Sequence, residues 1–177
     1  MDIKVVALVG PKGNTPLKYT YNDNKLSITL NKRYTNVEKY TVYIAYTAKP
    51  DELKVKGSAA ITDAKGLYFI NPDGADKNKP TQIWTQGETE SSSAWFPTID
   101  KPDQKTTAEI SMTVKSKYTT LSNGRLISQK PAANGLRTDT SKMDLPHSPY
   151  LFMMAVGELN ITKDTYKGKE ENYNLNP

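Results

Sequence analysis

Residues 82–103 read QIWTQGETESSSAWFPTIDKPD, and they join two segments that have the character of β-strands. A short apolar segment at its start runs into a polar loop that carries two carboxylates, Glu88 and Glu90, and three consecutive serines. Two prolines and two aspartates then close the loop before a regular strand begins at Thr106. Such a loop can hold a functional group rigidly without burying it, although a solvated surface loop has the same composition.

Segments on both sides of this loop alternate apolar and polar residues, which predicts β-strands. Asn22-Asp23-Asn24 and Asn123-Gly124 are typical of tight hairpin turns, the second of type I′, because Asn, Asp and Gly tolerate positive φ. No segment shows a sustained helical period, and 131–147 is too rich in turn residues to assign. We expect strands over 3–9, 17–21, 25–30, 39–47, 66–70, 82–84, 106–115, 118–121, 126–129 and 150–156.

These elements predict an all-β fold, a single-domain β-sandwich or curved open sheet that is mostly antiparallel. The chain has 177 residues, enough for one domain with a sizeable core. We expect residues 1–163 to form the domain and 164–177 to form a polar tail. The apolar segment 150–156 is expected to be a strand buried on both faces.

Composition and charge limit the possible functions. The net charge is +5, but basic and acidic residues are interspersed without a basic run, which argues against nucleic acid binding. The chain has no cysteine and only one histidine, His147, so a zinc site or a serine–histidine pair has too few partners. The segment 73–76, DGAD, lacks the spacing of a calcium-binding EF-hand loop. No apolar run reaches the length of a membrane span. We therefore expect no catalysis, metal or cofactor in this chain alone.

Three motifs, in the same order, resemble the N-terminal domain of the aminopeptidase N family of zinc metallopeptidases. Residues 85–88, TQGE, and 95–102, WFPTIDKP, are similar to the T-Q-x-E and F-P-x-x-D-x-P segments of that family. Residues 121–124, LSNG, resemble its L-S-N-G hairpin, and 150–159, YLFMMAVGEL, resemble its Y-L-x-x-x-x-x-G-x-[FL] strand. The matched region runs from 82 to 159.

The resemblance implies a role for Glu88. In the family this glutamate binds the free α-amino group of the substrate, and the glutamine two residues before it, here Gln86, lines the first side-chain pocket. A fixed carboxylate suits an ammonium, because their charge-assisted hydrogen bond contributes about 1.5–3 kcal/mol. The family also suggests a cis peptide bond between Glu88 and Thr89, with Glu90 a solvated neighbour. The residues expected to shape the loop are Gly87, Thr89, Pro97, Asp100 and Pro102.

The same resemblance places catalysis outside this chain. The family holds zinc with H-E-x-x-H and a later glutamate, which are absent here. The implied partners are a catalytic zinc domain, which this β domain would cap, and the amino termini of peptides. Three positions depart from the family pattern: Gly87 replaces a larger residue and is expected to loosen the loop, 91–93 lack an arginine, and Lys101 replaces glutamate or arginine.

Two further hypotheses remain open from the sequence. The chain could be a freestanding β-sandwich module that binds carbohydrate or protein, with Trp84, Trp95 and tyrosines as a sugar-stacking face, although aromatic residues in strands usually pack in cores or cross-strand pairs. The family has strands before the position of Ile3. Their absence would leave an unpaired edge, which predicts an edge-strand dimer of this fragment.

Overall fold

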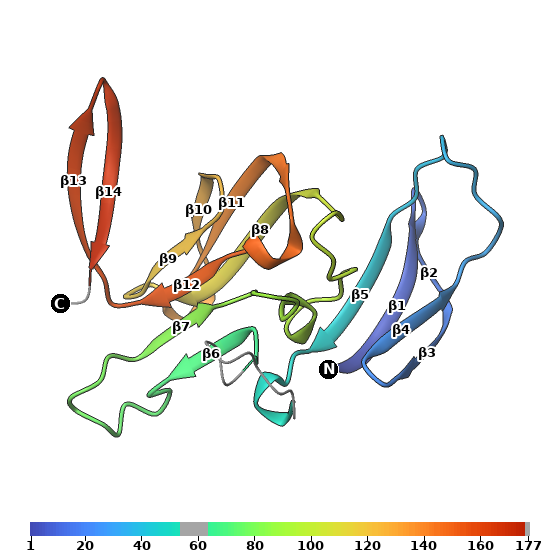
Figure 1. Ribbon diagram of the computed structural model, residues 1–177, viewed down its shortest axis with the longest axis horizontal. Helices are drawn as coiled ribbons and strands as arrows, with labels where there is room; N and C mark the ends of the chain where they lie inside the picture. The colour runs from blue at the N-terminus through green and yellow to red at the C-terminus, as the bar shows by residue number, and fades with distance from the viewer. Residues whose placement is uncertain (54–63, 176–177) are drawn as a thin grey trace.

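The structure, a computed structural model, describes residues 1–53 and 64–175 and confirms an all-β fold made of antiparallel sheets. Figure 1 shows two sheets of N-terminal strands at one end, a central body, and a hairpin of the last two strands that projects at the other end. Short 3-10 turns interrupt the chain at η1 (Pro50–Glu52), η2 (Ser92–Ala94), η3 (Ala133–Gly135) and η4 (Pro149–Leu151).

The N-terminal part contains a three-stranded sheet and a separate hairpin. In the sheet, β1 lies between β2 and β5, and its residues Val6 and Ala7 are buried. The hairpin of β3 and β4 turns at Asp23 and Asn24, which have φ values of 50° and 61°, so the tight turn predicted here is confirmed. The strands are β1 (Asp2–Gly10), β2 (Gly13–Pro16), β3 (Lys18–Asn22), β4 (Lys25–Thr29) and β5 (Val42–Thr47).

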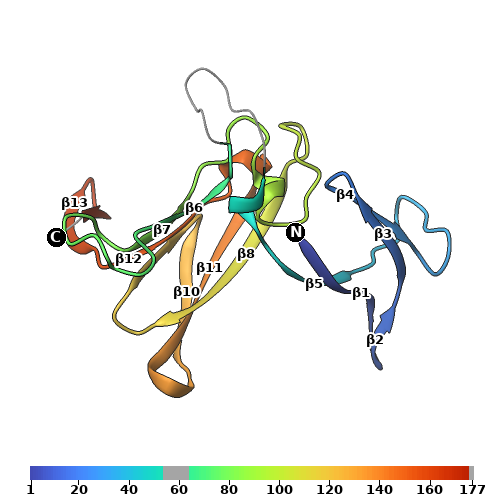
Figure 2. The same ribbon diagram turned by 90° about the horizontal axis from the view of Figure 1, so that it is seen from below.

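Two sheets form the central body. One has the order β6-β7-β12-β9 and the other β10-β11-β8. Figure 2 shows β10, β11 and β8 side by side. Between them a cluster of Leu67, Trp95 and Phe152 is buried, and Ile83 from one sheet and Ile110 from the other pack against it. The strands are β6 (Leu67–Ile70), β7 (Gln82–Thr85), β8 (Thr106–Lys115), β9 (Thr119–Ser122), β10 (Arg125–Pro131), β11 (Leu136–His147) and β12 (Met154–Gly157).

The predicted hairpin at Asn123-Gly124 is wrong, because β9 and β10 belong to different sheets: β9 pairs with β12, and β10 pairs with β11. Only Gly124 has positive φ, 82°, whereas a type I′ turn needs it at both central residues. A Cβ on Gly124 would lie 2.0 Å from the carbonyl oxygen of Lys142. The side chain of Asn123 hydrogen-bonds to the backbone of Leu151 and Met153. The chain therefore passes, at a turn held by Asn123, from the sheet of β9 to the sheet of β10.

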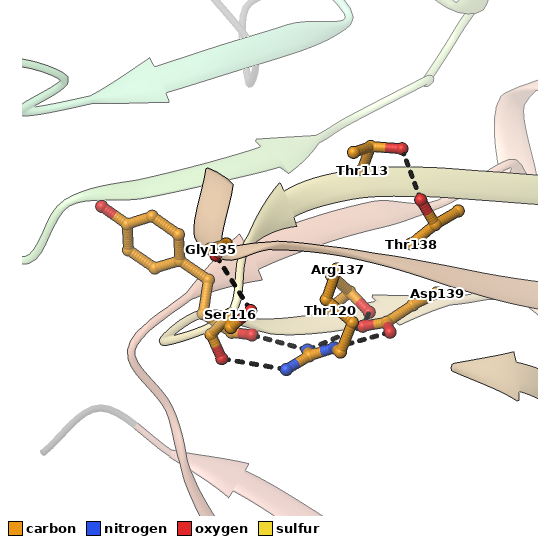
Figure 3. A network of polar contacts seen from close by, with 8 residues as sticks. Thr113, Ser116, Thr120, Gly135, Arg137, Thr138 and Asp139 are labelled. Carbon is orange, nitrogen blue, oxygen red and sulfur yellow. Dashed lines mark hydrogen bonds and ion pairs between the residues drawn. The ribbon is translucent and has the colours of Figure 1, made fainter. Parts of the chain in front are cut away.

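The unassigned segment 131–147 contains β11, the central strand of its sheet. This strand buries a carboxylate, Asp139, which is 1% exposed. Arg137 donates to it from Nε and Nη2, at 2.7 Å each, and Thr120 donates from Oγ1 at 2.7 Å (Figure 3). Arg137 also donates to the carbonyl oxygens of Ser116 and Tyr118, so one guanidinium ties β11 to the connection between β8 and β9.

The C-terminal segments also differ from expectation. The strand predicted over 150–156 begins only at Met154, because η4 at Pro149–Leu151 turns the chain first. Beyond it, β13 (Asn160–Tyr166) and β14 (Lys169–Leu175) pair as an exposed hairpin. The segment 164–177 expected as a polar tail is therefore largely hairpin, and residues 176 and 177 lie outside the described residues.

Candidate functional site

The loop over residues 86–103, here called the acidic loop, leaves the end of β7 and is fastened first to Gly66. The backbone N–H of Gln86 donates to the carbonyl oxygen of Gly66 at 3.0 Å. Gly66 has φ of 71°, and a Cβ there would lie 2.0 Å from the carbonyl oxygen of Ser91. Only glycine permits both this conformation and this close approach.

The loop is fastened a second time to the chain around η4. Ser92 is fully buried, and its Oγ donates to the carbonyl oxygen of Pro149 at 2.8 Å. Gly87 is buried, and a Cβ on it would lie 2.4 Å from the carbonyl oxygen of Tyr150. The expectation that Gly87 loosens the loop is therefore wrong: its missing side chain lets the backbone pack tightly against Tyr150.

Glu88 lies on the exposed part of this fastened loop. Its peptide bond to Thr89 is cis, which confirms the expectation from the family pattern, and Thr89 is exposed as well. The Glu88 carbonyl oxygen accepts from Ser91 Oγ at 3.2 Å. Within residues 1–53 and 64–175, no hydrogen bond or ion pair involves the Glu88 carboxylate. This carboxylate is therefore available to a ligand.

Glu90, two residues further along, is in a different situation. Its Oε2 accepts from Lys101 Nζ at 2.7 Å, and both side chains are about half exposed. The hydrogen bond to Glu90 raises the pKa of Lys101, and the negative charges of Glu90, Asp100 and Asp103 raise it further. Glu90 is solvated, as expected, and its charge is also compensated within the loop by Lys101.

The second half of the acidic loop is held by backbone contacts. Asp100 Oδ2 accepts from the backbone N–H of Ser93 at 2.7 Å, and the carbonyl oxygen of Pro102 accepts from Ser148 Oγ. Pro97 is half-buried beside a groove of about 360 Å³, which Trp95, Phe96 and the first half of β8 also line. Pro97 and Pro102, two of the residues expected to shape the loop, thus lie at its contacts with the body, whereas Asp100 joins the two halves of the loop to each other.

Gln86 lies two residues before Glu88, and its own backbone N–H makes the hydrogen bond to Gly66. Its side chain is half-buried, and its Oε1 accepts a long hydrogen bond of 3.4 Å from the Glu88 N–H. The two residues named from the sequence as substrate-binding therefore lie together. Sequence reasoning missed the residues that support them, Gly66, Ser92 and Pro149. A glycine at the first position of the strand predicted over 66–70 was the one available signal, whereas the contacts of Ser92 and Pro149 join residues far apart in the chain.

The described residues offer no metal site. No group of three or more His, Cys, Asp or Glu side chains among them could hold a metal ion. His147 is the last residue of β11, and its buried ring stacks on Phe152 with centroids 4.5 Å apart. Nor does the described chain contain a helix long and apolar enough to cross a membrane.

The aromatic residues divide between the core and a surface pair. Trp95 is 9% exposed and belongs to the core cluster. Trp84 is 40% exposed, and its ring stacks on that of its cross-strand partner Tyr68 with centroids 4.6 Å apart. The two tryptophans do not form one exposed face, so the sugar-stacking arrangement is not present.

Comparison with known proteins relates this chain to a protein family. Residues 3–151 match the family described as the Peptidase M1 N-terminal domain. The chain belongs to this family. The puromycin-sensitive aminopeptidase of Caenorhabditis elegans is 31% identical over an alignment of 174 residues, and the match covers 95% of this chain and 17% of that protein. This M1 N-terminal domain is therefore similar to a small part of a much longer relative.

Solved structures share the fold of this M1 N-terminal domain. An M1 zinc metallopeptidase from Deinococcus radiodurans has a TM-score of 0.71 at 17% identity, with 92% of this chain and 33% of that chain covered. A two-domain M1 zinc metallopeptidase bound to L-arginine has a TM-score of 0.72 at 16% identity, with 96% and 36% covered. The chain thus spans about a third of these solved chains, and at such identities the likeness concerns the fold alone.

Proposed function

We propose that this M1 N-terminal domain binds the amino terminus of a peptide through Glu88, as part of a zinc-dependent aminopeptidase whose active site it caps. The single observation that carries this proposal is the difference between the two glutamates of the acidic loop. Glu90 is paired with Lys101, whereas the Glu88 carboxylate is exposed and has no partner among the described residues.

A free carboxylate on a fastened backbone suits recognition of an ammonium group. Backbone and side-chain contacts at Gln86, Ser91 and Ser92 hold the loop before a ligand arrives, so binding orders little of the protein. A charge-assisted hydrogen bond from an α-ammonium to Glu88 would contribute about 1.5–3 kcal/mol. Holding the amino terminus also sets the distance to the first peptide bond, which positions that bond for cleavage elsewhere.

The other residues of the loop take supporting roles in this proposal. Gln86, beside Glu88, lines the pocket for the first side chain. Gly87 and Thr89 set the backbone on either side of Glu88. Pro97 and Pro102 hold the returning half of the loop against the body, and Asp100 joins that half to Ser93.

Zinc belongs to the proposal only for a domain outside this chain. The similar solved structures are named zinc metallopeptidases, but the described residues here do not provide a metal-binding group. The role of this domain is therefore binding and positioning, and we expect no hydrolysis by the 177-residue chain alone. The alternative of a freestanding binding module is not favoured, because the matched relatives carry this domain as part of a longer peptidase.

The test is a charge-removing substitution in the full-length protein that carries this domain. Glu88→Gln keeps the size of the side chain, and loss of about 1.5–3 kcal/mol lowers kcat/KM for an aminoacyl p-nitroanilide by about 10- to 150-fold. Glu90→Gln is the matched control, and its effect stays within about fivefold because exposed pairs contribute little. Equal effects of the two substitutions, or a full-length protein without aminopeptidase activity, would contradict the proposal.

A further inference from the structure

The acidic loop carries four carboxylates and a single basic residue, Lys101. Lys101 Nζ lies 2.7 Å from Glu90 Oε2, and the charges of Asp100 and Asp103 act on it as well. The Asp100 carboxylate also accepts from the backbone N–H of Ser93. The one cation of the loop is thus committed to the carboxylates other than Glu88.

Resting on the proposed role of Glu88, we propose that Lys101 sets the charge selectivity of the acidic loop. By pairing with Glu90, it leaves Glu88 as the anion that a ligand meets at the exposed turn. One free anion at this turn, which holds Glu88 and Glu90, matches one cation, the α-ammonium. The loop therefore favours peptides whose first side chain is neutral over peptides whose first side chain is also cationic.

The distances support an effect of measurable size. Glu88 and Glu90 are two residues apart, so their Cα atoms are separated by at most about 7 Å. A released Glu90 carboxylate would act on a ligand at Glu88 within a Debye length of about 8 Å at physiological ionic strength. Because both groups are exposed to water, the interaction changes binding of a second positive charge by about two- to fivefold.

The experiment compares two substrates in the full-length protein, lysine p-nitroanilide and norleucine p-nitroanilide. Their side chains have nearly the same length and differ in an ammonium against a methyl group. The quantity measured is the ratio of kcat/KM for lysine to that for norleucine. In Lys101→Met we expect this ratio to rise by about two- to fivefold at low salt and to return toward the wild-type value at high salt.

Two further variants separate charge from loop shape. The double variant K101M/E90Q has neither charge, so we expect it to restore the wild-type ratio. Lys101→Arg keeps the charge and leaves the ratio unchanged. The Lys101 side chain is 59% exposed, so these substitutions leave the fold in place, which a thermal melt verifies. Calorimetric titration with lysinamide and norleucinamide gives the same ratio from binding alone.

Three results would overturn the inference: an unchanged ratio in Lys101→Met, a shifted ratio that persists in the double variant, or an equal fall for both substrates. The last would mean that Lys101 only holds the loop. Glu88→Gln in the same assay tests the proposed function separately. If Glu88→Gln weakens both substrates while Lys101→Met leaves the ratio unchanged, only the present inference fails. If Glu88→Gln changes nothing, the anchoring role itself fails.

Discussion

Replacing Arg137 by methionine is the substitution in this domain whose energetic consequence follows most directly from the geometry. Asp139 is 1% exposed; Arg137 donates two hydrogen bonds to its carboxylate, Thr120 donates another, and Gln129 hydrogen-bonds to it as well. Arg137→Met leaves the buried carboxylate with only the neutral side chains of Thr120 and Gln129 as partners. Removing one partner of a buried ion pair typically costs about 3–5 kcal/mol. With a urea m value of about 2 kcal/mol/M, the unfolding midpoint falls by about 1.5–2.5 M.

The pH dependence of this loss follows from the direction of the pKa shift. The Arg137 hydrogen bonds hold the pKa of Asp139 below its ordinary value, so the pair adds stability above the unfolded pKa of about 3.9. That stability is lost as pH falls through the lower folded pKa. The difference in unfolding free energy between wild type and Arg137→Met is therefore largest at neutral pH and shrinks below about pH 4.

Two variants complete the urea-unfolding assay. Lys142→Met, on the same strand, removes an exposed pair with Asp144 and should cost less than about 1 kcal/mol. The double variant R137M/D139N removes the uncompensated charge and should recover part of the loss. A loss below about 1 kcal/mol for Arg137→Met at pH 7, or one that stays constant down to pH 3, would refute the reasoning.

Two remaining predictions concern the contact of Gly66 with the acidic loop and the edges of the sheets. Gly66→Ala and Gly135→Ala place alanine at nearly equal positive φ, 71° and 70°. The new Cβ meets other atoms only at Gly66, whereas at Gly135 it meets none within 4 Å. Gly66→Ala should therefore lower the melting temperature by several degrees more than Gly135→Ala does. Similar melting temperatures would contradict the contact with Ser91. The strands β5 and β8 end their sheets in the described part of the chain, and we expect the isolated chain to self-associate through such edges with rising concentration. Light scattering that shows a monomer throughout would contradict this.

Local chemistry in the sequence predicted much of the scaffold. The β3–β4 turn follows from Asp23 and Asn24, which tolerate the positive φ that they adopt. The alternation over Thr106–Lys115 predicted β8 with the observed bounds, because its side chains alternate between the body and solvent. The motif around Glu88 placed the candidate residues and the cis peptide bond on one loop. In each case the information lies in neighbouring residues, where short-range sterics and periodicity decide the outcome.

Tertiary structure alone decided the rest, because the partners are distant in the chain. The segment holding β11 looked like turns, since its buried positions are filled by the polar residues Asp139, Ser141 and His147. Contacts from Arg137, Thr120 and Gln129 make the Asp139 carboxylate tolerable inside. The strands β9 and β10 flank a good turn signal, yet hydrogen bonding to β12 and β11 stabilises two sheets instead of one hairpin. The two glutamates of the acidic loop look equivalent in the sequence. The return of the chain brings Lys101 to Glu90 and leaves the Glu88 carboxylate without a partner in the part of the chain that the structure describes. That electrostatic difference arises only in the folded loop.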